Sequence, residues 1–188
     1  MGALPNGVWI GKYFKKIDIR EHGSKNSGAT NAYRVLGPKY GLMVLAADAL
    51  KGFLPPFIAS RYGVTGNMLL LIGVLAIVGH SLSFFLHFKG GKGVATSLGV
   101  FLFLIPNVTL ALLIVFILVV YFTRYISLGS IIAAAALPIL TALSPVGYGI
   151  GKTPLLVMTT LIGVFVIYRH RTNIKRLMEG TENKFKLK

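Results

Sequence analysis

The polar stretch from His22 to Gly37 holds the residues most suited to binding an anion. It combines glycines with hydroxyl, amide and guanidinium groups, contributed by Ser24, Asn26, Ser27, Thr30, Asn31 and Arg34. Hydroxyls and amides donate hydrogen bonds, an arginine adds a planar fork of donors, and glycine lets backbone N–H groups approach a ligand closely. A phosphate group needs these donors, so the stretch predicts a phosphate site. An ordinary polar loop rich in turn residues is the alternative.

A second candidate is the sequence Lys89-Gly-Gly-Lys-Gly-Val-Ala-Thr96, which leads into an apolar run. Glycines and a lysine at a helix start offer free N–H groups and the positive end of the helix dipole to an anion. We therefore expect Gly91 and Lys92 to contact phosphate. The segment does not fit the Walker pattern G-x-x-x-x-G-K-[ST], which argues against an ATPase. A flexible hairpin carrying two basic residues is the alternative.

Asp48, Lys51 and His80 are ionisable residues within apolar segments. Asp48 and Lys51 are three residues apart, so on a helix they share a face. Charges inside a membrane are costly and are usually paired or functional. A structural ion pair is favoured slightly over a direct part in chemistry, and His80 is expected to pack between helices.

Further donors occur later in the chain, next to basic residues. Ser127 follows Arg124, and His170 and Asn173 would face the same way on a helix. They could join a phosphate site. The basic stretch that begins at Arg169 could also bind anionic lipid, and the two roles are compatible.

The elements that must position these residues are apolar. The 188-residue chain is 54% hydrophobic and 13% charged, whereas a soluble domain has about 25% charged residues. A membrane-spanning helix needs about 20 mostly apolar residues. We expect an all-α, polytopic membrane protein that forms a single domain over residues 1–188, with about seven spans, some of them short. The apolar segments are Ala3–Phe14, Tyr40–Ser60, Asn67–Phe88, Val94–Ile105, Val108–Phe122, Ile126–Leu143 and Pro154–Tyr168.

The 20 Lys and Arg residues against five Asp and Glu give a net charge of +15. If the seven segments alternate in direction, the connections facing one side hold most of these cations. The opposite side has only Arg61 and Lys152. Positive charge tends to stay in the cytoplasm, so the basic excess is explained by topology and requires no nucleic-acid partner. The C-terminus and the connections carrying both phosphate candidates are then cytoplasmic.

Several kinds of chemistry lack their residues. There is no cysteine, no zinc-type histidine cluster and no G-x-S-x-G elbow. The His-x-x-x-x-Asp motif of common glycerolipid acyltransferases does not occur. We expect no metal and no cofactor. A phosphate-ester transporter with broken helices and a non-catalytic scaffold for anionic lipids remain alternatives, although seven spans without an evident repeat and the donor-rich loop argue against them.

The motifs together resemble the bacterial acyl-phosphate:glycerol-3-phosphate acyltransferases, the PlsY family. His22-Gly-Ser-Lys-Asn-Ser-Gly-Ala-Thr-Asn-Ala-Tyr-Arg-Val-Leu-Gly37 is similar to the family's first motif, and Asp48-Ala-Leu-Lys-Gly52 to its D-x-x-K-G. Gly79-His80 with Phe88-Lys-Gly-Gly-Lys-Gly-Val-Ala-Thr96 resembles a third motif. Tyr168-Arg-His-Arg-Thr-Asn-Ile-Lys-Arg-Leu177 and Gly180-Thr-Glu182 resemble the tail. The similarity covers nearly the whole chain.

The resemblance implies a seven-helix inner-membrane enzyme of phospholipid biosynthesis. Such an enzyme moves a fatty acyl group from acyl phosphate to position 1 of glycerol 3-phosphate and forms lysophosphatidate and phosphate. It would lie among membrane lipids, beside the enzyme that makes acyl phosphate. By similarity, a phosphate site would be built by Ser24, Asn26, Thr30, Asn31, Arg34, Gly91 and Lys92 and closed by Ser127, His170 and Asn173.

Among these, Lys92, Arg34, Ser24 and His170 are the expected catalytic residues. An acyl phosphate has a good leaving group, so the main tasks are to juxtapose two anions and to stabilise charge. A phosphate of the substrate is the expected base, because its second pKa lies near 6; His170 is the alternative.

This chain also departs from the family pattern. Lys25 stands where the family usually has glycine, and its cation would either strengthen phosphate binding or crowd a tight turn. The segment Ser81–Phe85 lacks the aromatic and proline pattern that is common after Gly-His, and the family's first helix is longer at its N-terminal end.

Overall fold

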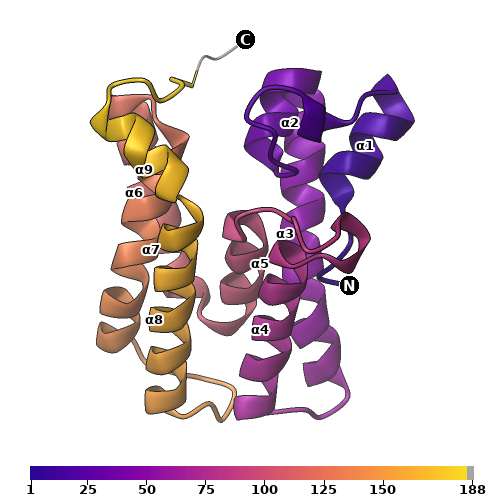
Figure 1. Cartoon of the computed structure of the whole chain (residues 1–188). Helices are drawn as coiled ribbons and strands as arrows, with labels where there is room; N and C mark the ends of the chain where they lie inside the picture. Colours follow the sequence, from indigo (N-terminus) through magenta and orange to yellow (C-terminus); the bar gives the residue numbers. More distant parts are fainter. Residues whose placement is uncertain (186–188) are drawn as a thin grey trace. The chain divides into compact units, whose positions relative to one another are not determined.

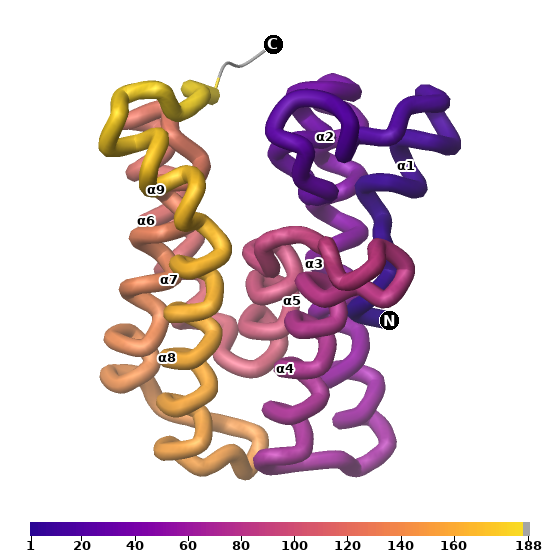
Figure 2. The backbone as a smooth tube through the Cα atoms, in the orientation of Figure 1, coloured from indigo at the N-terminus to yellow at the C-terminus, as the bar shows by residue number. Residues whose placement is uncertain are grey.

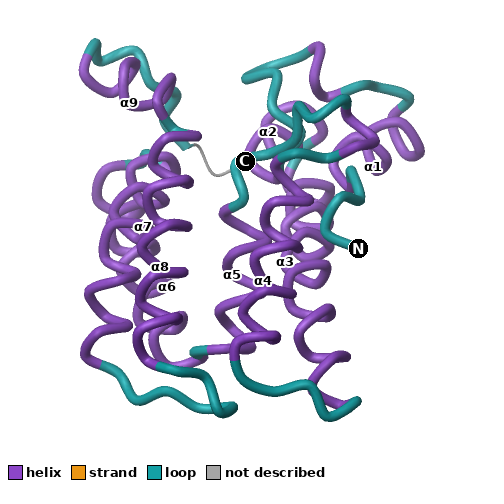
Figure 3. Tube along the Cα trace, turned by 60° about the horizontal axis from the view of Figure 1, so that its bottom comes forward, coloured by secondary structure: helices purple, strands orange, loops and turns teal. Residues whose placement is uncertain are grey.

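The computed structural model describes residues 1–185, and all regular structure within that range is helical (Figures 1 and 3). This confirms the prediction of an all-α fold. In chain order the elements are α1 (Asn6–Lys15), η1 (Ile19–Glu21), α2 (Ala29–Leu36), α3 (Pro38–Arg61), α4 (Asn67–Ser81), η2 (Phe84–Leu86), α5 (Val94–Leu104), α6 (Pro106–Thr123), α7 (Ile126–Leu143), α8 (Lys152–Arg169) and α9 (Arg171–Met178).

Five segments within residues 1–185 are long and apolar enough to cross a membrane: Pro38–Arg61, Asn67–Leu86, Pro106–Thr123, Ile126–Leu143 and Lys152–Arg169. They correspond to five of the seven expected spans. Helix α1, with 10 residues, and α5, with 11, are shorter than a full span requires. The expected number of seven spans therefore stays a prediction.

Two boundaries differ from the prediction because local contacts end or begin a helix. The third apolar segment was expected to continue to Phe88, but α4 ends at Ser81. Beyond it the Ser83 hydroxyl donates to the Ala3 carbonyl at 2.5 Å, and the Phe88 N–H turns back to the Ser83 carbonyl at 2.9 Å. The stretch from His22 to Gly37 was expected to be a connection, yet its second half is helix α2.

The described chain forms two compact units. The first contains Met1–Val64 and Leu71–Phe103, and the second contains Thr65–Leu70 and residues 104–185. The single-domain organisation over residues 1–188 stays a prediction.

In the first unit, α1 and α2 pack against α3 around a small apolar core of Ile19, Ala32, Leu36 and Val44. Proline at the first position of α3 suits a helix start, because its missing N–H has no partner there in any case. A Cβ on Gly41 would lie 2.5 Å from Tyr33 Cβ, so glycine is required where α3 and α2 touch. Helix α2 is thereby fixed to the start of the first long helix.

Small residues also bring α5 against α3 in this unit. A Cβ on Gly99 would lie 2.8 Å from the Ala49 carbonyl carbon, and one on Gly52 would lie 3.0 Å from the Thr96 carbonyl carbon. Small residues allow such close backbone approach in membrane helices. The loop that precedes α5 and carries Lys92 is therefore anchored beside the middle of α3 (Figure 2).

The second unit is built on α6, α7 and α8, with α7 packing against both of the others. Gly163 of α8 lies against α7, where a Cβ would be 2.6 Å from the Ala134 carbonyl oxygen. The Lys152 ammonium donates to the carbonyls of Thr141, at 2.7 Å, and of Ser144 at the end of α7. A cation at a helix C-terminus also complements the helix dipole.

Candidate functional site

The turn that begins the first candidate segment is shaped by the side chain of Asn31. This residue is 1% exposed. Its amide nitrogen donates to the carbonyls of Ile19 at 2.7 Å, His22 at 3.1 Å and Asn26 at 2.9 Å, and its amide oxygen accepts the Ser24 N–H at 2.8 Å. Asn31 was predicted as a direct phosphate donor. The structure shows its amide holding the turn together.

The turn presents the other predicted donors from a fixed backbone. Asn26 Oδ1 accepts the Gly28 N–H at 2.9 Å, and Gly28 is the N-cap residue of α2. Ser24 is exposed, whereas Thr30 and Arg34 are half-buried on α2. Thr30 and Arg34 are four residues apart on a helix and so share one face. The arrangement suits a ligand with several acceptor oxygens.

The approach to this turn is stabilised by an ion pair. Arg20 donates to Asp18 through Nε at 3.0 Å and through a terminal nitrogen at 2.7 Å, and Lys12 lies 3.4 Å from the same carboxylate. The Arg20 hydrogen bonds hold the pKa of the Asp18 carboxyl well below its usual range. Asp18 therefore stays ionised and caps η1 at neutral pH.

The Gly90–Gly93 loop and the first turn of α5 form the second candidate. Gly93 has a φ of +88°, which favours glycine, and Lys92 is half-buried between buried glycines. Lys92 thus lies in a tightly folded loop, two residues before the N-terminus of the 11-residue helix α5.

Two hydroxyls that the sequence analysis did not assign lie in the first turn of α5. Thr96 and Ser97 are 0% and 8% exposed, and neither hydroxyl has a hydrogen-bond partner within the described residues. A buried hydroxyl without a partner costs about 1–3 kcal/mol. We add both to the candidate site. Their position in the sequence, four and five residues after Lys92, could have indicated them.

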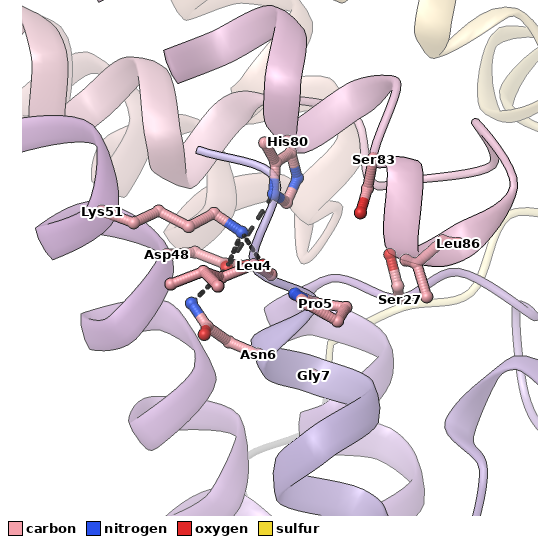
Figure 4. A pocket seen from close by; sticks show the side chains of 10 residues that line it. All are labelled: Leu4, Pro5, Asn6, Gly7, Ser27, Asp48, Lys51, His80, Ser83 and Leu86. Carbon is pink, nitrogen blue, oxygen red and sulfur yellow. Dashed lines mark hydrogen bonds and ion pairs between the residues drawn. The ribbon is translucent and has the colours of Figure 1, made fainter. Parts of the chain in front are cut away.

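The charged residues of α3 form a buried cluster with the N-terminal segment (Figure 4). Asp48 Oδ1 lies 2.7 Å from Lys51 Nζ and accepts the Asn6 amide at 3.0 Å, while Lys51 donates to the Leu4 carbonyl at 2.6 Å. The predicted shared face and ion pair are confirmed. The recess that the cluster lines also contains His80 and Ser83, and it is too narrow for a water molecule. The cluster therefore joins α3 to the N-terminal segment through buried polar contacts.

In the second unit, Glu182 binds two of the predicted substrate contacts. Its Oε1 accepts the Ser127 hydroxyl at 2.8 Å and the Asn173 amide at 2.7 Å, and its Oε2 accepts Arg176 Nε at 2.7 Å. Burial alone raises the pKa of the Glu182 carboxyl, but the three hydrogen bonds and the Arg176 charge outweigh it and lower the pKa. Glu182 was not predicted as a site residue. The signal was its place as one of only five acidic residues, in a strongly basic tail.

His170 stands at the break between α8 and α9. Its Nδ1 lies 2.8 Å from the Val166 carbonyl oxygen, which can only accept, so Nδ1 carries the proton. In the neutral ring Nε2 is then the basic nitrogen. The ring is 3% exposed. His170 and Asn173 were expected to face the same way on a helix. Both are buried; His170 directly precedes α9, and Asn173 is the third residue of that helix.

The predicted residues are divided between the two units. Ser24, Asn26, Thr30, Asn31, Arg34, Gly91 and Lys92 belong to the first unit, and Ser127, His170 and Asn173 to the second. Their assembly into one site stays a prediction. Over the described residues, no group of three or more His, Asp or Glu side chains is placed to hold a metal ion.

Comparisons with known proteins agree on one family. The sequence pattern of the family described as glycerol-3-phosphate acyltransferase matches residues 1–180. A glycerol-3-phosphate acyltransferase from Fusobacterium nucleatum is 59% identical over 186 residues, which cover 99% of this chain and 93% of the relative. One from Bacillus subtilis is 46% identical over 188 residues, with the same coverage of 99% and 93%.

Two solved structures have the same fold at a TM-score of 0.86. Both are PlsY, an integral membrane glycerol 3-phosphate acyltransferase. Its glycerol 3-phosphate form is 39% identical and covers 98% of this chain and 92% of that one. Its lysophosphatidic acid form is 40% identical, with 98% and 90% covered. The chain is therefore an integral membrane protein that belongs to the glycerol-3-phosphate acyltransferase family.

Proposed function

We propose that this protein transfers a fatty acyl group from acyl phosphate to the 1-position of glycerol 3-phosphate, releasing lysophosphatidate and inorganic phosphate. The observation that carries the proposal is the likeness to PlsY, whose structures are named as glycerol 3-phosphate and lysophosphatidic acid forms. Lysophosphatidic acid is glycerol 3-phosphate with one acyl group added. The two names thus describe an acceptor and its acylated product.

The proposal that acyl phosphate is the acyl donor is supported by the number of groups in the first unit that can bind phosphate. The turn around Ser24 with Arg34 is one set, and Lys92 with the start of α5 is a second. Two sets suit a reaction that brings together two phosphate-bearing molecules. The chain also lacks the Walker loop that would bind a nucleotide phosphate.

The reaction is a single acyl transfer. The hydroxyl oxygen at position 1 bonds to the acyl carbonyl carbon, and the bond from that carbon to the phosphate oxygen breaks. The electron pair leaves with inorganic phosphate. Lys92 and Arg34 supply positive charge for the two anions and for the charge that develops on the leaving phosphate.

The hydroxyl proton requires an acceptor. A phosphate oxygen of the substrates suits this role, because a phosphate monoester has a second pKa near 6. His170 is the alternative, and its fixed tautomer, with the basic nitrogen at Nε2, is compatible with it.

We place the protein in the bacterial inner membrane with the site on the cytoplasmic side. The basic connections support this orientation through the positive-inside rule. The acyl chain would lie among membrane lipids, and glycerol 3-phosphate would enter from the cytoplasm. The donor must come from a reaction that phosphorylates a fatty acid or transfers an acyl group to phosphate.

Phosphate release by the detergent-purified protein tests the proposal. We expect release from palmitoyl phosphate that depends on glycerol 3-phosphate, and none from palmitoyl-CoA. Lys92→Ala should lower kcat/KM by about 10²-fold or more. Lys89→Ala, which removes an exposed lysine from the same connection, should leave the rate unchanged. Folded protein without release, or uptake of glycerol 3-phosphate into liposomes without acylation, would contradict the proposal.

A further inference from the structure

His80 lines the recess beside Asp48 and Lys51 and also lies directly against the loop that carries Lys92. It is the penultimate residue of α4 and is 6% exposed. It lies in the first unit with Asp48 and the Gly90–Gly93 loop. Each of its relevant contacts is therefore internal to one compact unit.

One edge of the His80 ring supports the loop. A Cβ on Gly91 would overlap His80 Nε2 and would lie 2.7 Å from Cε1. A Cβ on Gly90 would overlap the His80 carbonyl oxygen, and the Gly90 N–H donates to the Ser81 carbonyl at 3.1 Å. Glycine is needed at both positions because the backbone lies on His80. Gly91 thus packs on the His80 ring, whereas Gly90 packs on the backbone carbonyls of His80 and Ser81.

The other ring nitrogen faces the buried charge of α3. His80 Nδ1 lies 3.9 Å from Asp48 Oδ1, and that oxygen is held by Lys51 and Asn6 at 2.7 and 3.0 Å. Figure 4 shows the ring pointing into this cluster. The carboxylate is held from two segments and lies beside the ring. A continuous series of contacts therefore leads from α3 through His80 to the loop.

We propose that His80 is a positioning residue for acyl transfer: its ring, oriented by Asp48, supports Gly91 and so holds the Lys92 ammonium at the phosphate site. This inference rests on the proposed function for its catalytic consequence, and on geometry alone for the order of the loop. His80 acts through Lys92 and makes no contact with substrate in this assignment.

Two substitutions of His80 distinguish the roles of its two ring nitrogens. His80→Gln places an amide near the position of Nε2, where Gly91 lies, whereas His80→Asn retains a polar group only near Nδ1. We expect His80→Asn to lower kcat/KM on the order of tenfold, because a small displacement of a catalytic group has effects of this size. His80→Gln should recover most of the rate. Equal losses in the two variants would overturn the assignment.

His87→Asn is the matched control for these substitutions. His87 is exposed in the same connection and has a φ of +49°, which asparagine tolerates. It should retain the wild-type rate.

A double-mutant cycle distinguishes positioning from a general loss of folded protein. If His80 acts through Lys92, His80→Asn should have no further effect on kcat/KM once Lys92 is alanine. If His80→Asn lowers kcat/KM by the same factor in both backgrounds, the proposal is overturned. A merely structural defect lowers activity whichever residue stands at position 92.

Hydrogen exchange tests the inference without activity. Peptides covering residues 89–97 should exchange faster in His80→Asn than in the wild-type protein, while peptides from α7 stay unchanged. Unaltered exchange in the loop would overturn the positioning role. If the wild-type protein released no phosphate, the proposed function would fail, and the exchange result would still decide whether His80 orders this loop.

Discussion

Lys25 adopts a left-handed backbone conformation, with a φ of +56°, beside Gly23 at +59°. A side chain in this region costs about 1–2 kcal/mol, most of which glycine avoids. We expect Lys25→Gly to raise the melting temperature relative to Lys25→Ala, which removes the charge but keeps the strain. Thermal unfolding in detergent measures this, and equal melting temperatures would refute it. The family's usual glycine at this position agrees with the backbone.

The choice of general base is also decided at the scale of one residue. With a substrate phosphate as base, His170→Ala should keep kcat within about tenfold of the wild-type value. Loss of several decades in kcat with KM unchanged would assign the base to His170. Because His170 also contacts the Val166 carbonyl at the end of α8, the folded fraction of the variant must be measured with its rate.

At the scale of elements, Glu182 ties the chain beyond α9 to α7 and α9. Its lowered pKa means that the ionised form stabilises the folded protein. That stabilisation is complete above the ordinary glutamate pKa of 4.5 and is lost as the pH falls through the lower folded value. Glu182→Gln should therefore unfold at a lower temperature than the wild-type protein at pH 7.

The difference between Glu182→Gln and the wild-type protein should shrink as the pH falls below 4.5. Melting temperatures of both proteins from pH 7 down to pH 4 and below measure this. The exposed Glu179→Gln is the control and should show little difference at any pH. A constant difference between wild type and Glu182→Gln would contradict the assignment.

At the scale of the whole molecule, the absence of cysteine allows a direct test of orientation. Lys89→Cys and Arg61→Cys each introduce one thiol at an exposed position on connections expected to face opposite sides. A membrane-impermeant maleimide applied to intact spheroplasts should label residue 61 and not residue 89. After the membrane is opened, both should react. The reverse pattern would place the candidate site on the outer face.

Much of the secondary structure could be predicted from the sequence. Helix type and approximate bounds follow from apolar segment length, since a chain in lipid must satisfy its backbone hydrogen bonds internally. Pro38 begins α3 as its chemistry suggests. Helix α2 was not foreseen as a helix, because it has only eight residues and its polar donors resemble those of a loop. Its stability comes from packing on α3 and from the Asn31 network.

From the sequence alone one can read which residue types are available: a donor-rich turn, a glycine-lysine loop, an acidic and a basic residue within one apolar segment, and basic residues gathered in alternate connections. What each residue contacts depends on how the helices pack. Asn31 turns its amide to backbone carbonyls, and Glu182 takes the Ser127 hydroxyl. His80 lies under Gly91. Spacing along a chain fixes neighbours only within one helix, whereas contacts such as Asp48 to His80 or Ser127 to Glu182 join distant segments and arise only when helices pack.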